Sequence, residues 1–309
     1  MIKNIVIAGG SGFIGKELIK SLHKEGHQLY ILTRQMPERF PALNGVHYIQ
    51  WMPKNANDFV AELPDPINSI INLSGASLNG GQWTRKRKAL LIESRLQTTD
   101  ALIRLIAKVK TKPSLLINAS AVGIYGTSET ATYTETSSVG NSDFLSDLTS
   151  SWEKSALQAE QFGVRTVCAR FGIVLGKKGG VLPLLNLPYR FFIGGKIASG
   201  QQWLSWIHVD DLVRLMKFLM DHQEIRGPVN FTAPNPVTMK TFGKTQAKLL
   251  KRPYWLNIPE SLIKLTLGER SLIVTKGQRV LPQKALNAGF HFHFTQLEQA
   301  LYDLSKISN

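Results

Sequence analysis

The sequence predicts an α/β protein, a doubly wound parallel sheet with a smaller C-terminal substrate lobe. Short apolar runs alternate with stretches in which apolar residues recur at helical spacing, as in parallel strands joined by helical crossovers. A glycine-rich turn joins the first run to the first helical stretch. After Gly179 and Gly180 the chain becomes proline-punctuated and loop-rich. We therefore expect a sheet domain at residues 1–178, a lobe at 179–309, and one strand near 228–232 that returns to the sheet.

The first strand and helix follow from the apolar pattern. Residues 5–8 are four consecutive apolar residues, as in a strand that is buried on both faces. Apolar residues then recur at helical spacing from Phe13 to Leu22, and Gly26 ends the run. The chain thus begins with a strand, a tight turn and a helix.

Further strands and helices are expected in alternation. Strands are predicted over residues 28–33, 46–51, 69–76, 113–120, 164–175 and 206–209, and helices over 86–109, 151–162 and 210–221. The strand at 69–76 ends in small residues, which leave room for a ligand at the sheet edge. From Lys240 the pattern is helical, and a distinct C-terminal segment begins at about residue 250.

The turn after the first strand predicts a dinucleotide site. Its glycines stand at 9, 12 and 15. Gly9 can adopt the sharp turn, Gly12 lets a pyrophosphate approach the main chain, and Gly15 lets the helix pack closely. The helix N-terminus then offers free N–H groups to the phosphates. An ordinary glycine turn is the alternative, but the strand before and the helix after supply the context that the motif requires.

The end of the second strand favours NADP(H) over NAD. A carboxylate about 20 residues beyond the glycines would bind the ribose 2′-hydroxyl of NAD. Thr33 and Arg34 stand there instead, and a guanidinium suits a 2′-phosphate. The alternative is a solvated arginine at a strand end.

Composition bounds the class of protein. The chain has 309 residues, 43% hydrophobic and 19% charged, without a signal pattern or a run of 18 apolar residues. We therefore expect a cytoplasmic protein with no membrane partner. Cys168, the single cysteine, excludes an intrachain disulfide and is expected as a buried thiol in a strand.

The net charge of +15 has a simple interpretation. The cations are spread widely except at residues 85–88, which are typical of a solvated helix start. No aromatic-interleaved basic surface appears, so we expect no nucleic-acid partner. An anionic cofactor and a small-molecule substrate are the expected partners, and a homodimer stays open.

Several motifs carry a resemblance to a known family. They are the turn at 9–15, Asn72-Leu73-Ser74-Gly75, the segment 120–126, residues 170–176 and the segment 206–211. The chain resembles extended short-chain dehydrogenases/reductases. Trp152-Glu153, Gly200-Gln201-Gln202 and the segments 277–282 and 289–290 are similar to one branch, the poorly characterised NAD-dependent epimerase or NADP-dependent oxidoreductase family with a C-terminal domain of unknown function.

The resemblance implies a Rossmann-type domain that binds NADP(H), with NAD as the less favoured cofactor. The implied cofactor contacts are Gly9, Gly12, Phe13, Ile14, Gly15, Thr33, Arg34, Leu73, Ser74, Gly75, Arg95, Ser120, Phe171, Gly172 and Ile173. For Arg95 the alternative is a charge on the helix surface.

The usual catalytic pair is missing from the expected helix. Extended reductases use a tyrosine as proton donor and a lysine four residues later that lowers its pKa. The register places Trp152 and Ala156 at these positions, and neither can do this chemistry. The usual serine position holds Ala121, and Ser120 stands one residue earlier.

No catalytic residue is assigned from the sequence, although four groups are candidates: Ser120, Tyr125, Glu153 and His208. Glu153 and Asp143 are expected as solvated acids, and His208 is expected to pack beside the sheet. No His, Asp or Glu spacing indicates a metal site.

The substrate is expected to be small and partly apolar. Nucleotide-sugar epimerases usually carry an arginine before the segment 207–210, where this chain has Leu204. The predicted substrate pocket is lined by Trp152, Trp203 and Trp206, with Tyr125 nearby. We expect an NADP(H)-binding oxidoreductase or epimerase-like protein, and the alternative is a non-catalytic NADP(H) sensor or scaffold.

Overall fold

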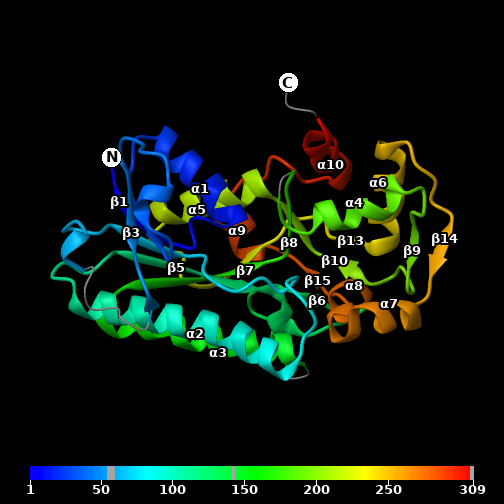
Figure 1. Cartoon of the computed structure of the whole chain (residues 1–309), viewed down its shortest axis with the longest axis horizontal. Coiled ribbons are helices and arrows are strands. Elements are labelled where there is room, and N and C mark those ends of the chain that lie inside the picture. Colours follow the sequence, from blue (N-terminus) through cyan, green and yellow to red (C-terminus); the bar gives the residue numbers. More distant parts are fainter. Residues whose placement is uncertain (54–59, 141–142, 178, 307–309) are drawn as a thin grey trace.

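The computed structural model describes residues 1–53, 60–140, 143–177 and 179–306 (Figure 1). Its centre is a seven-stranded parallel sheet in the order β12-β7-β5-β4-β1-β2-β3. The strands are β1 (Asn4–Ala8), β2 (Gln28–Thr33), β3 (Val46–Gln50), β4 (Ser69–Asn72), β5 (Leu115–Ala121), β7 (Arg165–Phe171) and β12 (Gly227–Phe231). The predicted α/β fold, a Rossmann-type doubly wound sheet, is confirmed.

Helices cover both faces of the sheet. On one side lie α1 (Phe13–Lys24) and α5 (Val209–Asp221), and on the other lie α2 (Arg85–Lys108) and α3 (Phe144–Leu157) (Figure 1). Two apolar cores fill the layers, one beneath α1 and α5 and one beneath α2. Both α5 and β12 come from beyond residue 178, so the chain returns to the sheet after entering the lobe.

The lobe lies at the end of the molecule away from the N-terminus (Figure 1). Its strand pairs are β8 (Ile173–Leu175) with β11 (Trp206–His208), β10 (Trp203–Leu204) with β13 (Val237–Thr238), β9 (Gly195–Ile197) with β14 (Leu256–Ile258), and β6 (Thr132–Tyr133) with β15 (Arg279–Val280). Its helices are α4 (Leu182–Arg190), α6 (Met239–Leu250), α7 (Glu260–Leu267), α8 (Leu272–Thr275) and α10 (Leu297–Ser305), while α9 (Gln283–Asn287) packs on β12. Short 3₁₀ turns span Pro37–Arg39, Val60–Glu62, Val122–Tyr125, Gln158–Phe162 and Gly268–Ser271.

The strand predicted over 69–76 ends at Asn72 in the structure, and two other predicted elements differ more. The strand expected over 164–175 is two strands, because β8 leaves the sheet after Gly172 to pair with β11. A Cβ at Gly172 would lie 2.5 Å from the Ser205 carbonyl oxygen, so the chain bends where a side chain has no room. The helix expected from 151 begins at Phe144, because the Asp143 carboxylate accepts the N–H groups of Leu145 and Ser146 as its N-cap.

Other expectations are confirmed. Cys168 lies buried in β7, and burial raises the pKa of its thiol, which makes it unreactive. Among the described residues, no helix combines the length and the apolar character needed to cross a membrane.

Replacing Gly15 with alanine is expected to lower the free energy of unfolding by about 1–3 kcal/mol. A Cβ there would lie 2.5 Å from the Gly9 carbonyl oxygen and 2.6 Å from Gly10 Cα, and backbone atoms cannot easily move aside. Gly123→Ala is the matched control, since its Cβ would meet its nearest atom, Leu145 Cβ, at 3.5 Å. Urea unfolding measures both, and equal losses would contradict the packing argument.

Candidate functional site

One cavity of about 560 Å³ follows the carboxyl edge of the sheet. It begins at the glycine turn, passes the ends of β4 and β5, and reaches the lobe. Of the predicted cofactor and pocket residues, it is lined by Gly9, Gly12, Phe13, Ile14, Gly15, Leu73, Ser74, Gly75, Arg95, Ser120, Phe171, Gly172, Ile173, Trp152 and Trp203. Within this predicted set alone, the topology gathers residues that lie up to 194 positions apart, from Gly9 to Trp203. This edge is where open parallel sheets bind ligands.

The glycine turn is built by close backbone contacts. Gly9 has φ +83°, and a Cβ there would lie 2.6 Å from the carbonyl carbon of Leu73. Gly12 is the N-cap of α1, and a Cβ on it would meet only the Gly9 carbonyl oxygen, at 3.3 Å. Gly9 and Gly15 are therefore needed for packing, whereas Gly12 leaves its cavity side open to a ligand at the helix N-terminus.

Phe13 ties this turn to the loop that leads into the lobe. Its ring occupies the space that a Cβ would take at Gly176 or at Gly179. These glycines allow the loop to lie directly against the first residue of α1. Gly180 and Val181, which follow, line the same cavity.

A buried polar network fixes the cavity wall on the α2 side. Trp152 Nε1 donates to Thr99 Oγ1 at 3.0 Å, and Asn72 Nδ2 donates to both Thr99 Oγ1 at 3.1 Å and Asn118 Oδ1 at 2.7 Å. The indole N–H thus points away from the cavity, so Trp152 offers a ligand only its ring. The Arg95 guanidinium lies 5.1 Å from the centre of that ring.

Arg95 is a buried cation that lines the cavity, not a charge on the helix surface. Its side chain is 9% exposed, and its Nη1 donates to the Leu91 carbonyl at 2.9 Å. Among the described residues no carboxylate pairs with it. Burial, followed by repulsion from Arg87, lowers the pKa of Arg95 to about 10, so it remains charged at neutral pH. An anionic ligand would supply the missing counter-charge.

A second buried network begins at Ser120. Ser120 Oγ donates to Glu153 Oε1 at 2.5 Å, and Arg170 donates to the two Glu153 oxygens at 2.8 Å each. Arg170 Nη1 also donates to the Tyr125 hydroxyl, which donates to Asn230 Oδ1, both at 2.8 Å. Burial alone would lower the pKa of Arg170, but its hydrogen bonds and its pairing with Glu153 raise it. The Glu153 side chain therefore accepts hydrogen bonds from Ser120 and from Arg170 at the same time.

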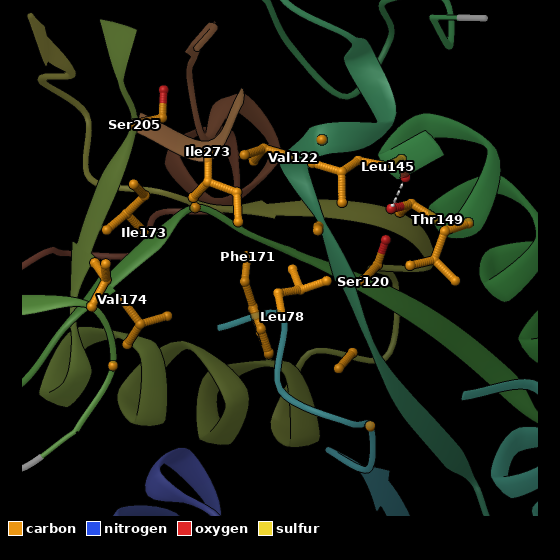
Figure 2. Close-up of a pocket in the computed structure, with 18 of the residues that line it drawn as sticks. Leu78, Ser120, Val122, Leu145, Thr149, Phe171, Ile173, Val174, Ser205 and Ile273 are labelled. Atoms are coloured by element: carbon orange, nitrogen blue, oxygen red, sulfur yellow. Dashed lines mark hydrogen bonds between the residues drawn. The ribbon is translucent and has the colours of Figure 1, made fainter. Parts of the chain in front are cut away.

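The structure corrects the solvated position expected for Glu153. This side chain is buried, because its bidentate partner Arg170 on β7 lies directly beside α3. Asp143 lines the cavity rim as the cap of α3. Ser120 lies among apolar side chains at the cavity surface (Figure 2).

Trp206, Tyr125 and His208 do not line the cavity. Trp206 is fully buried in the lobe core, and its Nε1 donates to the Asn235 carbonyl at 3.0 Å, so the predicted pocket position of Trp206 is corrected. Tyr125 lies behind Ser120 in the polar network, and burial raises the pKa of its phenol above the ordinary value. Thr33 is the last residue of β2 and Arg34 follows it; neither lines the cavity, and Thr33 is buried while Arg34 is exposed.

His208 caps a helix. Its Nδ1 accepts the Asp210 N–H at 3.1 Å, and its Nε2 lies 3.5 Å from Asp303 Oδ2. Its ring stacks on the Phe294 ring, with the two ring centres 3.9 Å apart. His208, Asp210 and Asp303 place one potential ligand atom each within 4.8 Å of one another. Because Nδ1 already accepts a hydrogen bond, Nε2 carries the proton of the neutral ring, and no ring lone pair faces a metal.

Sequence reasoning missed the cavity residues from other segments. Leu78 comes from the loop after β4, Leu145 and Thr149 from the start of α3, and Ile273 from α8 (Figure 2). Leu272, Lys276, Gly277 and Gln278 join them. Periodicity carries no signal for these positions, because only the tertiary fold brings the loop after β4, the start of α3 and the C-terminal segment to one cavity.

Together, the strand order, the glycine turn and the cavity define a nucleotide-binding protein of the extended short-chain dehydrogenase/reductase type. The chain belongs to the NAD dependent epimerase/dehydratase family, whose model matches residues 5–231. A model of a domain of unknown function (DUF1731) matches residues 258–304. The resemblance stated from the sequence is confirmed.

Several individual proteins are similar to this chain over nearly its whole length. The epimerase family protein YfhF of Bacillus subtilis is 48% identical over 301 residues, 97% of each chain. The crystal structure of human epimerase family protein SDR39U1 (isoform 2) with NADPH has a TM-score of 0.86 and 28% identity, covering 98% of this chain and 99% of that one. UDP-glucuronic acid 4-epimerase from Bacillus cereus, in complex with UDP-glucuronic acid and NAD, shares the fold at a TM-score of 0.79 and 16% identity, covering 97% and 98%.

Acidification is expected to destabilise the fold through His208. Burial lowers its folded-state pKa below 6.5, against the opposing charges of Asp210, Asp303 and Asp211. Below pH 6.5 the unfolded chain therefore takes up a proton that the folded chain resists, and stability falls by up to about 1.4 kcal/mol per pH unit. His208→Asn keeps a capping oxygen and should flatten this slope in urea unfolding between pH 7 and 5.

His291→Asn is the control, because His291 is exposed. Some slope should remain in His208→Asn, since burial also lowers the pKa of His27. An unchanged slope in His208→Asn would contradict this assignment.

Proposed function

We propose that this protein is an NADP(H)-dependent oxidoreductase or epimerase-like enzyme that acts on a small, partly apolar molecule. The observation that carries the proposal is one continuous cavity, which joins the α1 N-terminus to the Ser120 hydroxyl. A dinucleotide lying along it would place phosphates at the helix start and its reactive ring near Ser120. The site would belong to a cytoplasmic enzyme, which suits the single buried thiol of Cys168.

Arg34 supports NADP(H) over NAD, and Arg95 supports an anionic cofactor of either kind. Arg34 is exposed at the tip of β2, where the adenosine ribose lies in this fold, and no carboxylate follows it at once in the chain. Arg95 is the buried cation without a described acidic partner. The similar human protein was crystallised with NADPH, at 28% identity over nearly the whole chain.

Arg34→Ala should weaken NADPH binding about 10–100-fold and NADH binding about threefold or less, because only NADPH carries the 2′-phosphate. Arg95→Ala should weaken both, since a group facing the shared part of the dinucleotide does not distinguish them. Lys16→Ala, which removes an exposed charge on α1, is the control. Calorimetry with each cofactor measures these affinities, and an equal loss for both in Arg34→Ala would refute the 2′-phosphate contact.

Proton transfer in this proposal falls to Ser120 and Glu153. Trp152 and Ala156 stand where the related reductases carry tyrosine and lysine, and the Trp152 N–H is committed to Thr99. When bound, the nicotinamide supplies hydride transfer. In alcohol oxidation, Ser120 Oγ accepts the substrate hydroxyl proton while its own proton moves to Glu153 Oε1. In carbonyl reduction the two transfers reverse, and Glu153 returns the proton.

The cavity lining favours a substrate with little charge. Beyond the glycine turn its walls are largely apolar, and they include Leu78, Val122, Leu145, Leu204 and Ile273. Among its described lining residues, the charged side chains are Arg95, Asp143 and Lys276. We therefore propose a small carbonyl compound or alcohol instead of a nucleotide sugar, and no nucleic-acid partner.

The second candidate is a non-catalytic NADP(H) sensor. One observation favours it: Arg170 donates hydrogen bonds to both Glu153 carboxylate oxygens, so this side chain is already fully engaged in a buried pair. In that case the Ser120 hydroxyl would only contact the bound cofactor.

Turnover separates the two candidates. NADPH absorbance is followed with a panel of apolar aldehydes and ketones and, in reverse, with NADP and the alcohols. An enzyme should oxidise NADPH with at least one compound, and Ser120→Ala should lower kcat about 10²–10⁴-fold without loss of NADPH affinity. Glu153→Gln should lower kcat and change its pH profile, while Thr149→Val, also at the cavity wall, should keep that profile. Tight NADPH binding without turnover of any compound would favour the sensor.

A further inference from the structure

The helix α4 is apolar on two opposite faces, and only one of them is covered. Leu182 and Tyr189 are buried against the lobe. Leu184, Leu187 and Phe191 recur at positions i, i+3 and i+7, and they are 53%, 47% and 67% exposed. A helix that is apolar all round is normally covered all round. The outer face of α4 therefore lacks a partner within the described chain.

The apolar surface continues into the next segment. Phe192 and Ile193 are exposed after the helix, and Trp255, the residue before β14, lies beside them at 67% exposure. Trp255 Nε1 donates to the Phe192 carbonyl at 2.9 Å, and its backbone N–H donates to Gly194 at 3.1 Å. We call the six residues Leu184, Leu187, Phe191, Phe192, Ile193 and Trp255 the apolar tip. It lies at the lobe end of the molecule, on α4 and beside β9 and β14 (Figure 1).

The tip is held in place by hydrogen bonds. The Phe192 N–H donates to the Tyr189 carbonyl at 3.1 Å, and the Ile193 N–H donates to the Pro188 carbonyl at 2.9 Å. Phe192 has φ +61°, a conformation that few side chains adopt. Its exposed ring is therefore displayed by a formed turn and is not the product of a frayed helix end.

Several cations follow the tip in the chain or lie on neighbouring elements, and none of them forms an ion pair within the part of the chain that the structure describes. Arg190, Lys251 and Arg252 are exposed, and the Arg252 guanidinium lies 4.3 Å from the centre of the Phe192 ring. Lys240 and Lys244 add two exposed charges on α6. The segments 181–209 and 225–259 contain no aspartate or glutamate. The tip is thus a set of bulky apolar side chains within a field of positive charge.

We propose that the apolar tip docks this protein on an anionic lipid bilayer surface. Aromatic and aliphatic side chains that protrude together can enter the headgroup boundary, while nearby arginines and lysines contact lipid phosphates. Trp255 suits this boundary, because its ring is apolar and its N–H is already satisfied by Phe192. This inference does not depend on the proposed function and revises the expectation of no membrane partner.

A second copy of the chain fits the tip less well. A two-fold symmetric contact would bring each tip against itself, and the arginines and lysines would face one another without carboxylates. Nucleic acid fits less well because Leu184, Leu187 and Ile193 are aliphatic and offer no stacking surface. None of the tip residues lines the cavity of the candidate functional site, so the tip is a separate surface.

Vesicle sedimentation tests this proposal with the full chain. The protein should sediment with phosphatidylglycerol–phosphatidylcholine vesicles, should not sediment with phosphatidylcholine alone, and should dissociate at about 0.5 M salt. Leu184→Ser with Phe191→Ser, and separately Arg190→Glu with Arg252→Glu, should each reduce the bound fraction about tenfold or more. The tryptophan emission shift on vesicle binding should be lost in Trp255→Phe.

Matched controls sit elsewhere on the surface. Met36→Ser with Leu90→Ser removes exposed apolar side chains, and Arg85→Glu with Lys86→Glu removes exposed cations. Both should leave sedimentation unchanged, and circular dichroism melting confirms that every variant is folded. Failure of the parent chain to bind anionic vesicles overturns the proposal, as does equal loss in tip and control variants. RNA binding or a dimer that depends on the tip, without vesicle binding, also overturns it.

Discussion

The rest of the site depends on a steric constraint at the first turn. Gly9, Gly10 and Gly15 lie where the chain contacts itself too closely for a Cβ, against the end of β4, the side chains of Ile19 and Ile31, and the turn itself. This contact sets the start of α1 directly over the end of β1. The helix N–H groups and the adjacent strand ends then share one cavity, which explains why so short a motif positions so much of the site.

Two buried hydrogen-bond networks hold side chains of the cavity wall in position. One runs from Asn72 through Thr99 to Trp152, and the other from Ser120 through Glu153 and Arg170 to Tyr125. A buried ion pair contributes little net stability compared with apolar packing, yet the loss of one partner costs about 3–5 kcal/mol. These networks therefore fix the position of the Ser120 hydroxyl and the Trp152 ring more than they stabilise the fold. The Trp152 and Arg95 stack is held by the same arrangement.

The C-terminal segment completes the site from outside the sheet. Gly277 packs so closely on Trp203 that a side chain there would overlap the Trp203 carbonyl. The Ser205 hydroxyl donates to the Gln278 carbonyl and accepts the Val280 N–H. The Glu135 carboxylate accepts the N–H groups of Asn230 and Lys284, so the sheet edge and α9 are bound together. The cavity is thus enclosed by segments from both family-model regions, and neither region alone contains all of its walls.

Local patterns were sufficient for the fold and for the turn at 9–15. Apolar runs, helical spacing and glycine positions are properties of neighbouring residues, and they predicted a parallel sheet, its returning strand and the residues of the turn. These local patterns did not predict which partner each polar side chain would contact. The position of Glu153 on a helix predicted a solvated acid. In the structure β7 packs beside this helix, so Glu153 is the buried partner of Arg170. Trp206 was predicted as a pocket residue because it follows Trp203 closely in the chain. In the structure the Trp206 side chain lies in the lobe core and does not line the cavity. Side-chain burial and pairing arise from contacts between distant segments, and for that reason the tertiary structure alone decided which residues face the cavity.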